Sequence, residues 1–363
     1  KSADISLATG ALDHFAVTAS NAGANVVAGG YVTVSAQAKD IDGNNVTTAG
    51  TLVNWTQVRT TDAGVLPHLG SFSKASDGTA LATANQSATA VGGLAQVRYT
   101  TTTYSNVNAT VVATVDGGTA AGYSGAIPTT WGSVDHLTIT TQPSGARSGV
   151  VMTQQPVIEI RDSNQNVVEN SSAAVTVTIT SGDGTATVAY TATNASSGVI
   201  SLAGLKLTGP VGTYKVTFAA AGKSVESGDV SLGYGDIDHL AVTQDQAAVF
   251  NKVAVGDIKV QAQDSANNPI NNFTGRIDAT VVSSANGDLL TDGSGSTNHV
   301  SANGTSGTAT FSGLVYDASA ATLSSSTKVA FHFTVHGNAA HRAARAKALN
   351  DGDQRAEIGR AHV

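Results

Sequence analysis

The sequence contains no cysteine, and it is poor in charge and in aromatic side chains. Without cysteine the chain can form neither disulfides nor thiolate metal sites, and thiol catalysis is excluded. Charged residues make up 12% of the 363 residues, against about 25% in an average globular protein. No apolar run approaches the roughly 20 residues that a membrane-spanning helix needs. The sequence therefore predicts no membrane insertion, and solubility that rests on small hydroxyl and amide side chains.

Concentrated positive charge is also lacking. The formal net charge is −7, and the only segment rich in lysine and arginine is residues 339–363. Binding to nucleic acids or to anionic membranes requires clustered positive charge, so neither is expected as a partner.

The sequence does contain short segments that alternate apolar and polar residues. In residues 31–40, for instance, Val32, Val34, Ala36 and Ala38 share one face, and polar side chains occupy the other. A period of two residues is typical of half-buried strands. We expect an all-β protein, with one helical candidate at residues 339–349.

An internal repeat organises these strands. The segments LDHFAVT, VDHLTIT and IDHLAVT each carry an Asp-His pair, and these are Asp13-His14, Asp135-His136 and Asp238-His239. A second aspartate follows each pair at nearly constant spacing, and an asparagine lies four positions after it. These second landmarks are Asp40 with Asn44, Asp162 with Asn166, and Asp264 with Asn268. Asp and Asn close turns through nearby amides, so we expect a repeated hairpin turn.

The repeat divides the chain into modules. The expected modules are residues 12–132, which carry an insertion between 54 and 93, residues 133–235, and residues 236–338. Residues 1–11 align with the final strand of a module, whereas the third module lacks such a strand before the tail at 339–363, expected to be helical or disordered. By alignment, residues 1–9 are a final strand without a module ahead of them.

Two accounts fit this arrangement. The chain is a section of a longer tandem array, or residues 1–9 of one copy fill the open edge of the third module in the next copy. The last residues, EIGRAHV, resemble the translated read-through of a sequencing adapter, which favours the first account and an artefactual tail.

Strands of the VTVSAQAKD type, followed by an Asp- and Asn-rich turn and an apolar residue, resemble the bacterial immunoglobulin-like repeats of invasin and intimin type. The resemblance covers nearly all of residues 1–338. It implies tandem immunoglobulin-like β-sandwiches of about seven strands each, arranged as a rod, in an extracellular protein or at a bacterial cell surface. Strand lengths suggest that each module adds on the order of 40 Å.

Candidate sites for chemistry are few. The Asp-His pairs suggest acid-base catalysis, but neighbouring residues of a strand point to opposite faces, so a role in hydrogen bonding at module edges is the stronger interpretation. Asp40, Asp42 and Asn44 alternate oxygen ligands as some extracellular calcium loops do, although a hydrogen-bonded turn is favoured over a calcium site. No other cofactor is expected. In the linkers, Trp131 and Tyr234 precede glycine and are expected to pack between neighbouring modules.

Three functions remain open. The first is a non-enzymatic spacer, an adhesin stalk or fibre segment whose partners are neighbouring modules or identical subunits. The second is a self-assembling filament subunit joined by residues 1–9. The third is an accessory or carbohydrate-binding region of a larger secreted enzyme, which would need an exposed aromatic platform. No receptor can be assigned from the residues.

Overall fold

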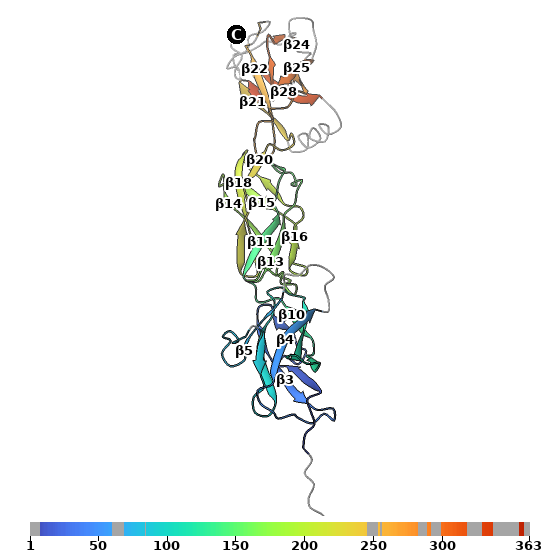
Figure 1. Cartoon of the computed structure of the whole chain (residues 1–363). Helices are drawn as coiled ribbons and strands as arrows, with labels where there is room; N and C mark the ends of the chain where they lie inside the picture. The colour runs from blue at the N-terminus through green and yellow to red at the C-terminus, as the bar shows by residue number, and fades with distance from the viewer. Residues whose placement is uncertain are drawn as a thin grey trace, which may run out of the picture.

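The computed structural model describes residues 8–59, 69–83, 85–244, 253–254, 256–281, 289–291, 299–317, 329–336 and 356–358. Three groups of strands follow one another along a single direction, in chain order (Figure 1). The helical candidate at 339–349 and the first seven residues of the donor segment 1–9 lie outside the described residues. No described segment is a helix long and apolar enough to cross a membrane.

The first module consists of two sheets. One sheet has the order β1-β3-β7-β5 and the other β2-β10-β8-β4-β6, with β9 paired to β8. The strands are β1 (His14–Ala19), β2 (Val26–Val27), β3 (Tyr31–Lys39), β4 (Leu52–Arg59), β5 (Ser71–Lys74), β6 (Gln86–Ala88), β7 (Leu94–Thr100), β8 (Asn108–Val115), β9 (Ala121–Tyr123) and β10 (Ile127–Thr130). Strands β5 and β6 belong to the insertion, and each adds an edge strand to one sheet.

The second module repeats this plan without the insertion. Its sheets have the orders β11-β13-β16 and β12-β20-β18-β14, with β19 paired to β18 and a separate pair β15-β17. The strands are β11 (His136–Thr141), β12 (Ala146–Arg147), β13 (Val157–Arg161), β14 (Thr176–Ser181), β15 (Thr187–Ala189), β16 (Val199–Ser201), β17 (Lys206–Thr208), β18 (Gly212–Ala220), β19 (Lys223–Glu226) and β20 (Val230–Gly233).

In the third module the two layers are continuous. The order is β21-β22-β26-β25-β23-β28-β29, because β25 pairs with both β26 and β23, and β24 pairs with β27. The strands are β21 (His239–Gln244), β22 (Ile258–Gln263), β23 (Arg276–Val281), β24 (Leu289–Thr291), β25 (His299–Thr305), β26 (Thr308–Phe311), β27 (Val315–Asp317), β28 (Val329–His336) and β29 (Ala356–Ile358).

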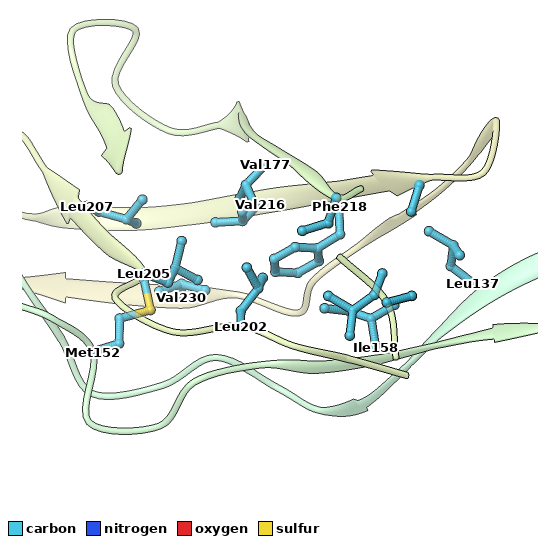
Figure 2. Packing of buried hydrophobic residues seen from close by; sticks show 14 of the residues in the cluster. Leu137, Met152, Ile158, Val177, Leu202, Leu205, Leu207, Val216, Phe218 and Val230 are labelled. Atoms are coloured by element: carbon cyan, nitrogen blue, oxygen red, sulfur yellow. The ribbon is translucent and has the colours of Figure 1, made fainter. Parts of the chain in front are cut away.

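Each module has its own hydrophobic core. The first surrounds Trp55 and Tyr99, the second surrounds Phe218 and Tyr214, and the third surrounds Phe311 and Phe331; all of these side chains are at most 2% exposed. Figure 2 shows the second core, where Phe218 and Val216 of one sheet face Ile158 and Leu137 of the other. The alternating burial along the strands produces these cores, since every second residue faces the opposite sheet. The expected all-β fold of tandem sandwiches is confirmed.

Residues 356–358 differ from the helical or disordered tail that the sequence suggests. They form β29, which pairs antiparallel with β28, so that Ala356 lies opposite Phe331 and Ile358 opposite Val329. In the second module the final strand β20 occupies the same place, with Val230 opposite Tyr214 and Leu232 opposite Gly212. The place of a final strand in the third module is thus taken by a segment of the tail.

Candidate functional site

The repeated Asp and Asn residues form one turn that occurs in all three modules. Asp162 follows β13, and its Oδ1 accepts hydrogen bonds from the main-chain N–H of Asn164 and Asn166, both over 2.9 Å. Asp264 Oδ1 accepts equivalent bonds from the second and fourth residues after it. Because one carboxylate satisfies several main-chain donors, a short polar segment can turn the chain from one strand to the next.

The same carboxylate holds the linker that enters its module. Gly132 N–H donates to Asp162 Oδ2 over 2.7 Å, and Gly235 N–H donates to Asp264 Oδ2 over 2.7 Å. These carboxylates are buried, with Asp162 1% and Asp264 0% exposed. Each aspartate therefore ties the incoming linker to the hairpin turn of the same module.

In the second and third modules, the asparagine of the turn reaches across the joint to the preceding module. Asn166 Nδ2 donates to the carbonyl of Thr103, and Asn166 Oδ1 accepts from the N–H of Ser105, both over 2.9 Å. One joint later, Asn268 makes the same pair of 2.9 Å bonds with the carbonyl of Gly209 and the N–H of Val211. In both joints one amide side chain thus binds a main-chain carbonyl and the N–H two residues further on.

Two linker rings reinforce the joints. Trp131 follows the last strand of the first module but packs against the core of the second, and its Nε1 donates to Asn170 Oδ1 over 3.1 Å. Tyr234 follows β20 and packs against the core of the third module. Each ring therefore lies in the linker along the sequence but packs against the core of the module that follows.

Further polar contacts differ between the two joints. At the first, Asn164 Nδ2 donates to the Ala28 carbonyl over 2.9 Å. At the second, Arg147 forms a 2.7 Å ion pair with Asp236 and donates to the Gly235 carbonyl over 3.1 Å. The amide pair and the aspartate–glycine bond are thus the elements common to both joints.

The calcium candidate in the first module has the geometry of this turn rather than of a metal site. Asp40 accepts hydrogen bonds from the N–H groups of Gly10, Asp42 and Asn44 and from Asn44 Nδ2. These donors fill the positions that cation ligands would share, whereas Ca²⁺ needs oxygen atoms converging on one point. The N–H of Gly10 is the main cause that lowers the pKa of Asp40 from 3.8, against an opposing effect of burial. Among the described residues, no group of three His, Asp or Glu side chains is arranged to hold a metal.

Asp162 experiences the same competition. Burial raises its pKa, but hydrogen bonds from Gly132, Asn166 and Asn164 outweigh burial, and the pKa lies below 3.8. The turn therefore carries an ionised carboxylate at neutral pH.

The Asp-His pairs lie at the start of the first strand of each module. The side chains do not face apart as the strand argument predicts: His14 Nδ1 is 2.9 Å from Asp13 Oδ2, and His136 Nδ1 is 2.9 Å from Asp135 Oδ2. The reason is that Asp13 precedes β1, so strict alternation does not apply to it. In the third pair, His239 Nδ1 lies 3.3 Å from Asp238 Oδ2.

The environment of these histidines is polar. His136 Nε2 lies 3.1 Å from Gln165 Oε1, and His239 Nε2 lies 3.1 Å from Gln263 Oε1. An amide, rather than a serine or a second carboxylate, therefore stands where a catalytic triad would place its nucleophile. These contacts connect the first strand of the second module to its turn, and the first strand of the third module to β22.

The tryptophans provide no open stacking platform. Trp55 is 0% exposed in the first core and donates to Ser87 Oγ over 2.8 Å, while Trp131 is engaged at the joint. A carbohydrate-binding surface of stacked aromatic rings therefore finds no support in these two side chains.

The chain is similar to solved structures of bacterial surface proteins. The Escherichia coli adhesin FdeC has a TM-score of 0.42 and 15% identity, over 92% of this chain and 96% of that chain. Invasin, an integrin-binding protein, has a TM-score of 0.30 and 17% identity, over 88% of this chain and 56% of that one. Domains 5–6 of the S-layer protein SbsC have a TM-score of 0.21 and 19% identity, over 62% of this chain and 99% of that one. No protein-family profile and no curated protein sequence matches the chain.

Proposed function

We propose that this chain is a non-enzymatic spacer segment, an adhesin stalk or fibre segment of a bacterial protein that is secreted or displayed at the cell surface. The observation that carries the proposal is the pair of matching joints. At both, a buried aspartate binds the linker and an asparagine binds the main chain of the preceding module. A chemistry repeated at every joint serves the connection between modules, whereas a catalytic site would occur once.

The joint chemistry suits a rod that must keep its length. The hydrogen bonds restrict rotation at the linker, and the packed rings of Trp131 and Tyr234 restrict bending. Two modules of one chain are already held together, so their contact does not carry the entropy cost of bringing two separate molecules together. A few polar contacts between modules are therefore enough to favour one orientation. The extended arrangement in Figure 1 follows from two such joints in series.

Small-angle X-ray scattering of the full chain tests this proposal. We expect the distance distribution of a narrow rod, and a broader distribution with a smaller radius of gyration for the double variant Asn166→Ala/Asn268→Ala. Asn45→Ala, an exposed asparagine of the first module, is the matched control and should leave the curve unchanged. A compact particle, or a wild-type chain as flexible as the double variant, would contradict a spacer role.

A self-assembling filament subunit is the second candidate, and the pairing of β29 with β28 favours it. The edge of β28 accepts an antiparallel strand, as β18 accepts β20 and β8 accepts β10 in their own modules. The occupant, residues 356–358, comes from a tail whose sequence does not repeat that of β20. Main-chain pairing of this kind tolerates a range of sequences, so a better-matched strand can replace it.

Residues 4–7 match the final strand more closely. They read DISL, whereas residues 229–232 in the second module read DVSL. In that alignment Ile5 corresponds to Val230, which is 2% exposed in its core. A second copy of the chain thus offers the strand that the third module would take up in a head-to-tail filament.

Sedimentation velocity separates the two candidates. If residues 4–7 are donated, the full chain forms larger species as its concentration rises, and Ile5→Asp abolishes them because a charge would enter the core. Ser6→Asp serves as the control, since its counterpart Ser231 is exposed. A monomer at every concentration, or polymers that persist in Ile5→Asp, would rule out donation of this strand and leave the spacer proposal intact.

A further inference from the structure

Arg98 on β7 has no charged partner among the residues that the structure describes. The other arginines with described side chains each form an ion pair with a carboxylate, and these are Arg147, Arg161 and Arg276. No described residue accepts a hydrogen bond from the Arg98 guanidinium, and its Nε–H is buried without a partner. A guanidinium binds carboxylates through two parallel hydrogen bonds, so Arg98 retains the capacity to bind an acidic group.

Two neighbours nevertheless set the position of the Arg98 side chain. Its Cζ lies over the ring of Tyr31, 4.0 Å from the ring centroid. Gly78 packs against the guanidinium so closely that a Cβ at this position would lie 2.5 Å from Nη1 of Arg98. A ligand would therefore meet an arginine whose orientation is already set, which lowers the entropy cost of binding.

The other two modules have no arginine at this position. The strand registers place three equivalent pairs of residues opposite each other, and these are Gln37 with Leu94, Glu159 with Val199, and Gln261 with Thr308. Four residues further on, Arg98 corresponds to Ala203 in the second module and to Ser312 in the third. Neither the sandwich fold nor the joints therefore require Arg98, which points to a role of its own.

The surroundings of Arg98 favour a sugar over a peptide as the ligand. Thr33 on β3 and Ser73 on β5 lie opposite Arg98, so their hydroxyl groups share its face of the sheet. The Tyr31 ring is 57% exposed, and an exposed ring offers an apolar surface to the C–H groups of a sugar. Strands β3 and β7 are each paired on both sides, so neither offers an open edge to a peptide strand.

We propose that Arg98 and Tyr31 form a binding site for a carboxylated sugar, with the carboxylate on the guanidinium and the sugar ring against the exposed part of Tyr31. The formal net charge of −7 opposes the binding of highly charged polymers, which favours a sugar with a single carboxylate at the site. The site would give one module of the chain a ligand of its own, and it does not depend on the spacer role.

Ligand-detected NMR of the full chain tests the site with glucuronic acid, galacturonic acid and N-acetylneuraminic acid. Glucose and galactose are the neutral controls, and triglutamate is the peptide control. We expect saturation transfer to at least one of the acidic sugars and to neither neutral sugar. Arg98→Met should abolish the signal, and Tyr31→Ala should weaken binding about tenfold because the cation–π contact and the ring surface are lost.

Lys39→Met is the matched control variant. It removes one positive charge from the same face of the same sheet, at the far end of β3 from Tyr31, and should bind as the wild type does. Fluorescence of Trp55, buried in the first core, verifies that each variant remains folded. Because Tyr31 is exposed, Tyr31→Ala keeps the test decisive if Arg98→Met fails to fold.

The outcomes separate a sugar site from the alternatives. Binding of an acidic sugar that is lost in Arg98→Met, weakened in Tyr31→Ala and preserved in Lys39→Met supports the site. No binding of any acidic sugar, equal binding of the neutral sugars, or unchanged binding in the Arg98 and Tyr31 variants would overturn it. Triglutamate bound as tightly as the sugars would overturn the assignment to carbohydrate. None of these results would alter the scattering curve that tests the spacer role.

Discussion

The residue at the fourth position of each joint turn adopts a left-handed backbone conformation. Gly43 has a φ of 81°, Gln165 of 70° and Asn267 of 63°. Glycine takes this conformation without steric cost and asparagine tolerates it, whereas for glutamine the contact between Cβ and the backbone costs about 1 kcal/mol. The same turn is therefore built with different amounts of strain in the three modules.

Gln165→Gly should stabilise the second module. Relief of the left-handed strain contributes about 1 kcal/mol, and the loss of the exposed Gln165–His136 hydrogen bond offsets less than half of it. Urea unfolding followed by Trp131 fluorescence measures the change, and Gln165→Gly made in a His136→Ala background measures the backbone effect without the lost bond. A lower unfolding midpoint in Gln165→Gly would show that the side chain matters more than the backbone.

The stability that the joint turns contribute should depend on pH. The pKa values of Asp40 and Asp162 lie below 3.8, because hydrogen bonds to N–H groups favour the ionised form. Because these pKa values are lower in the folded state than in the unfolded state, the ionised carboxylates stabilise the fold. This contribution is fully present above about pH 4 and is lost as the pH falls through the pKa values of the folded state.

Unfolding midpoints in urea between pH 7 and pH 2.5 measure this dependence. We expect a plateau above about pH 5 and a fall below pH 4. Asp162→Asn should flatten the fall in the second module and lower its stability at pH 7 by about 2 kcal/mol, since an amide cannot accept all of these hydrogen bonds. If Asp162→Asn showed the same dependence of stability on pH as the wild type, ionisation of Asp162 would not be a cause of that dependence.

At the scale of the elements, the sequence alone predicts the strands and the turns well. Alternation over residues 31–40 predicts β3, and the three Asp- and Asn-rich segments predict the turns that follow β3, β13 and β22. These features are local: side-chain period and turn chemistry lie within a few residues of one another.

Contacts across the joints could not be predicted in the same way. Asn166 binds Thr103 and Ser105 through main-chain atoms, and main-chain atoms leave no signature in a sequence. The contact between Asp13 and His14 was missed because it depends on where β1 begins, and alternation holds only within a strand. The pairing of β29 with β28 joins a strand to a segment without the repeat pattern.

The linker ring of the first joint should stabilise the module that follows it. Trp131→Ala removes a half-buried ring from the second core and should lower the stability of that module by about 2 kcal/mol, less than for a fully buried ring. Hydrogen exchange of the β13 amides measures this effect. Tyr123→Ala, which truncates a 66% exposed ring on β9, should change exchange little. If Trp131→Ala reduced protection only in the first module, Trp131 would stabilise the first module and not the second, which would contradict this prediction.

At the scale of the whole molecule, the proposed spacer role would require the chain to transmit force between its ends. In the first module, β2 near the start pairs in parallel with β10 near the end, and in the second module β12 pairs in the same way with β20. Pulling the chain ends apart moves two such strands along their length in opposite directions. All hydrogen bonds between them are then loaded together, which resists force better than breaking them one at a time.

Single-molecule stretching of the full chain should detect these parallel pairs. Ala28 N–H donates to the Thr130 carbonyl over 2.9 Å, and Ser148 N–H donates to the Gly233 carbonyl over 2.9 Å. Ala28→Pro removes the first bond and should lower the unfolding force of the first module, while Ser148→Pro should do so for the second. Val97→Ala, a core truncation on β7 expected to cost about 2 kcal/mol, is the control.

The control separates mechanical from thermodynamic stability. Val97→Ala lowers the free energy of unfolding without touching the parallel pair, so its module should keep most of its unfolding force, whereas Ala28→Pro should lose force out of proportion to its loss of free energy. If force falls in both variants in proportion to free energy, the pairs β2-β10 and β12-β20 carry no special load. The hydrophobic cores as a whole would then provide the resistance to extension. In that case only the joints would distinguish this chain from other proteins built of tandem β-sandwiches.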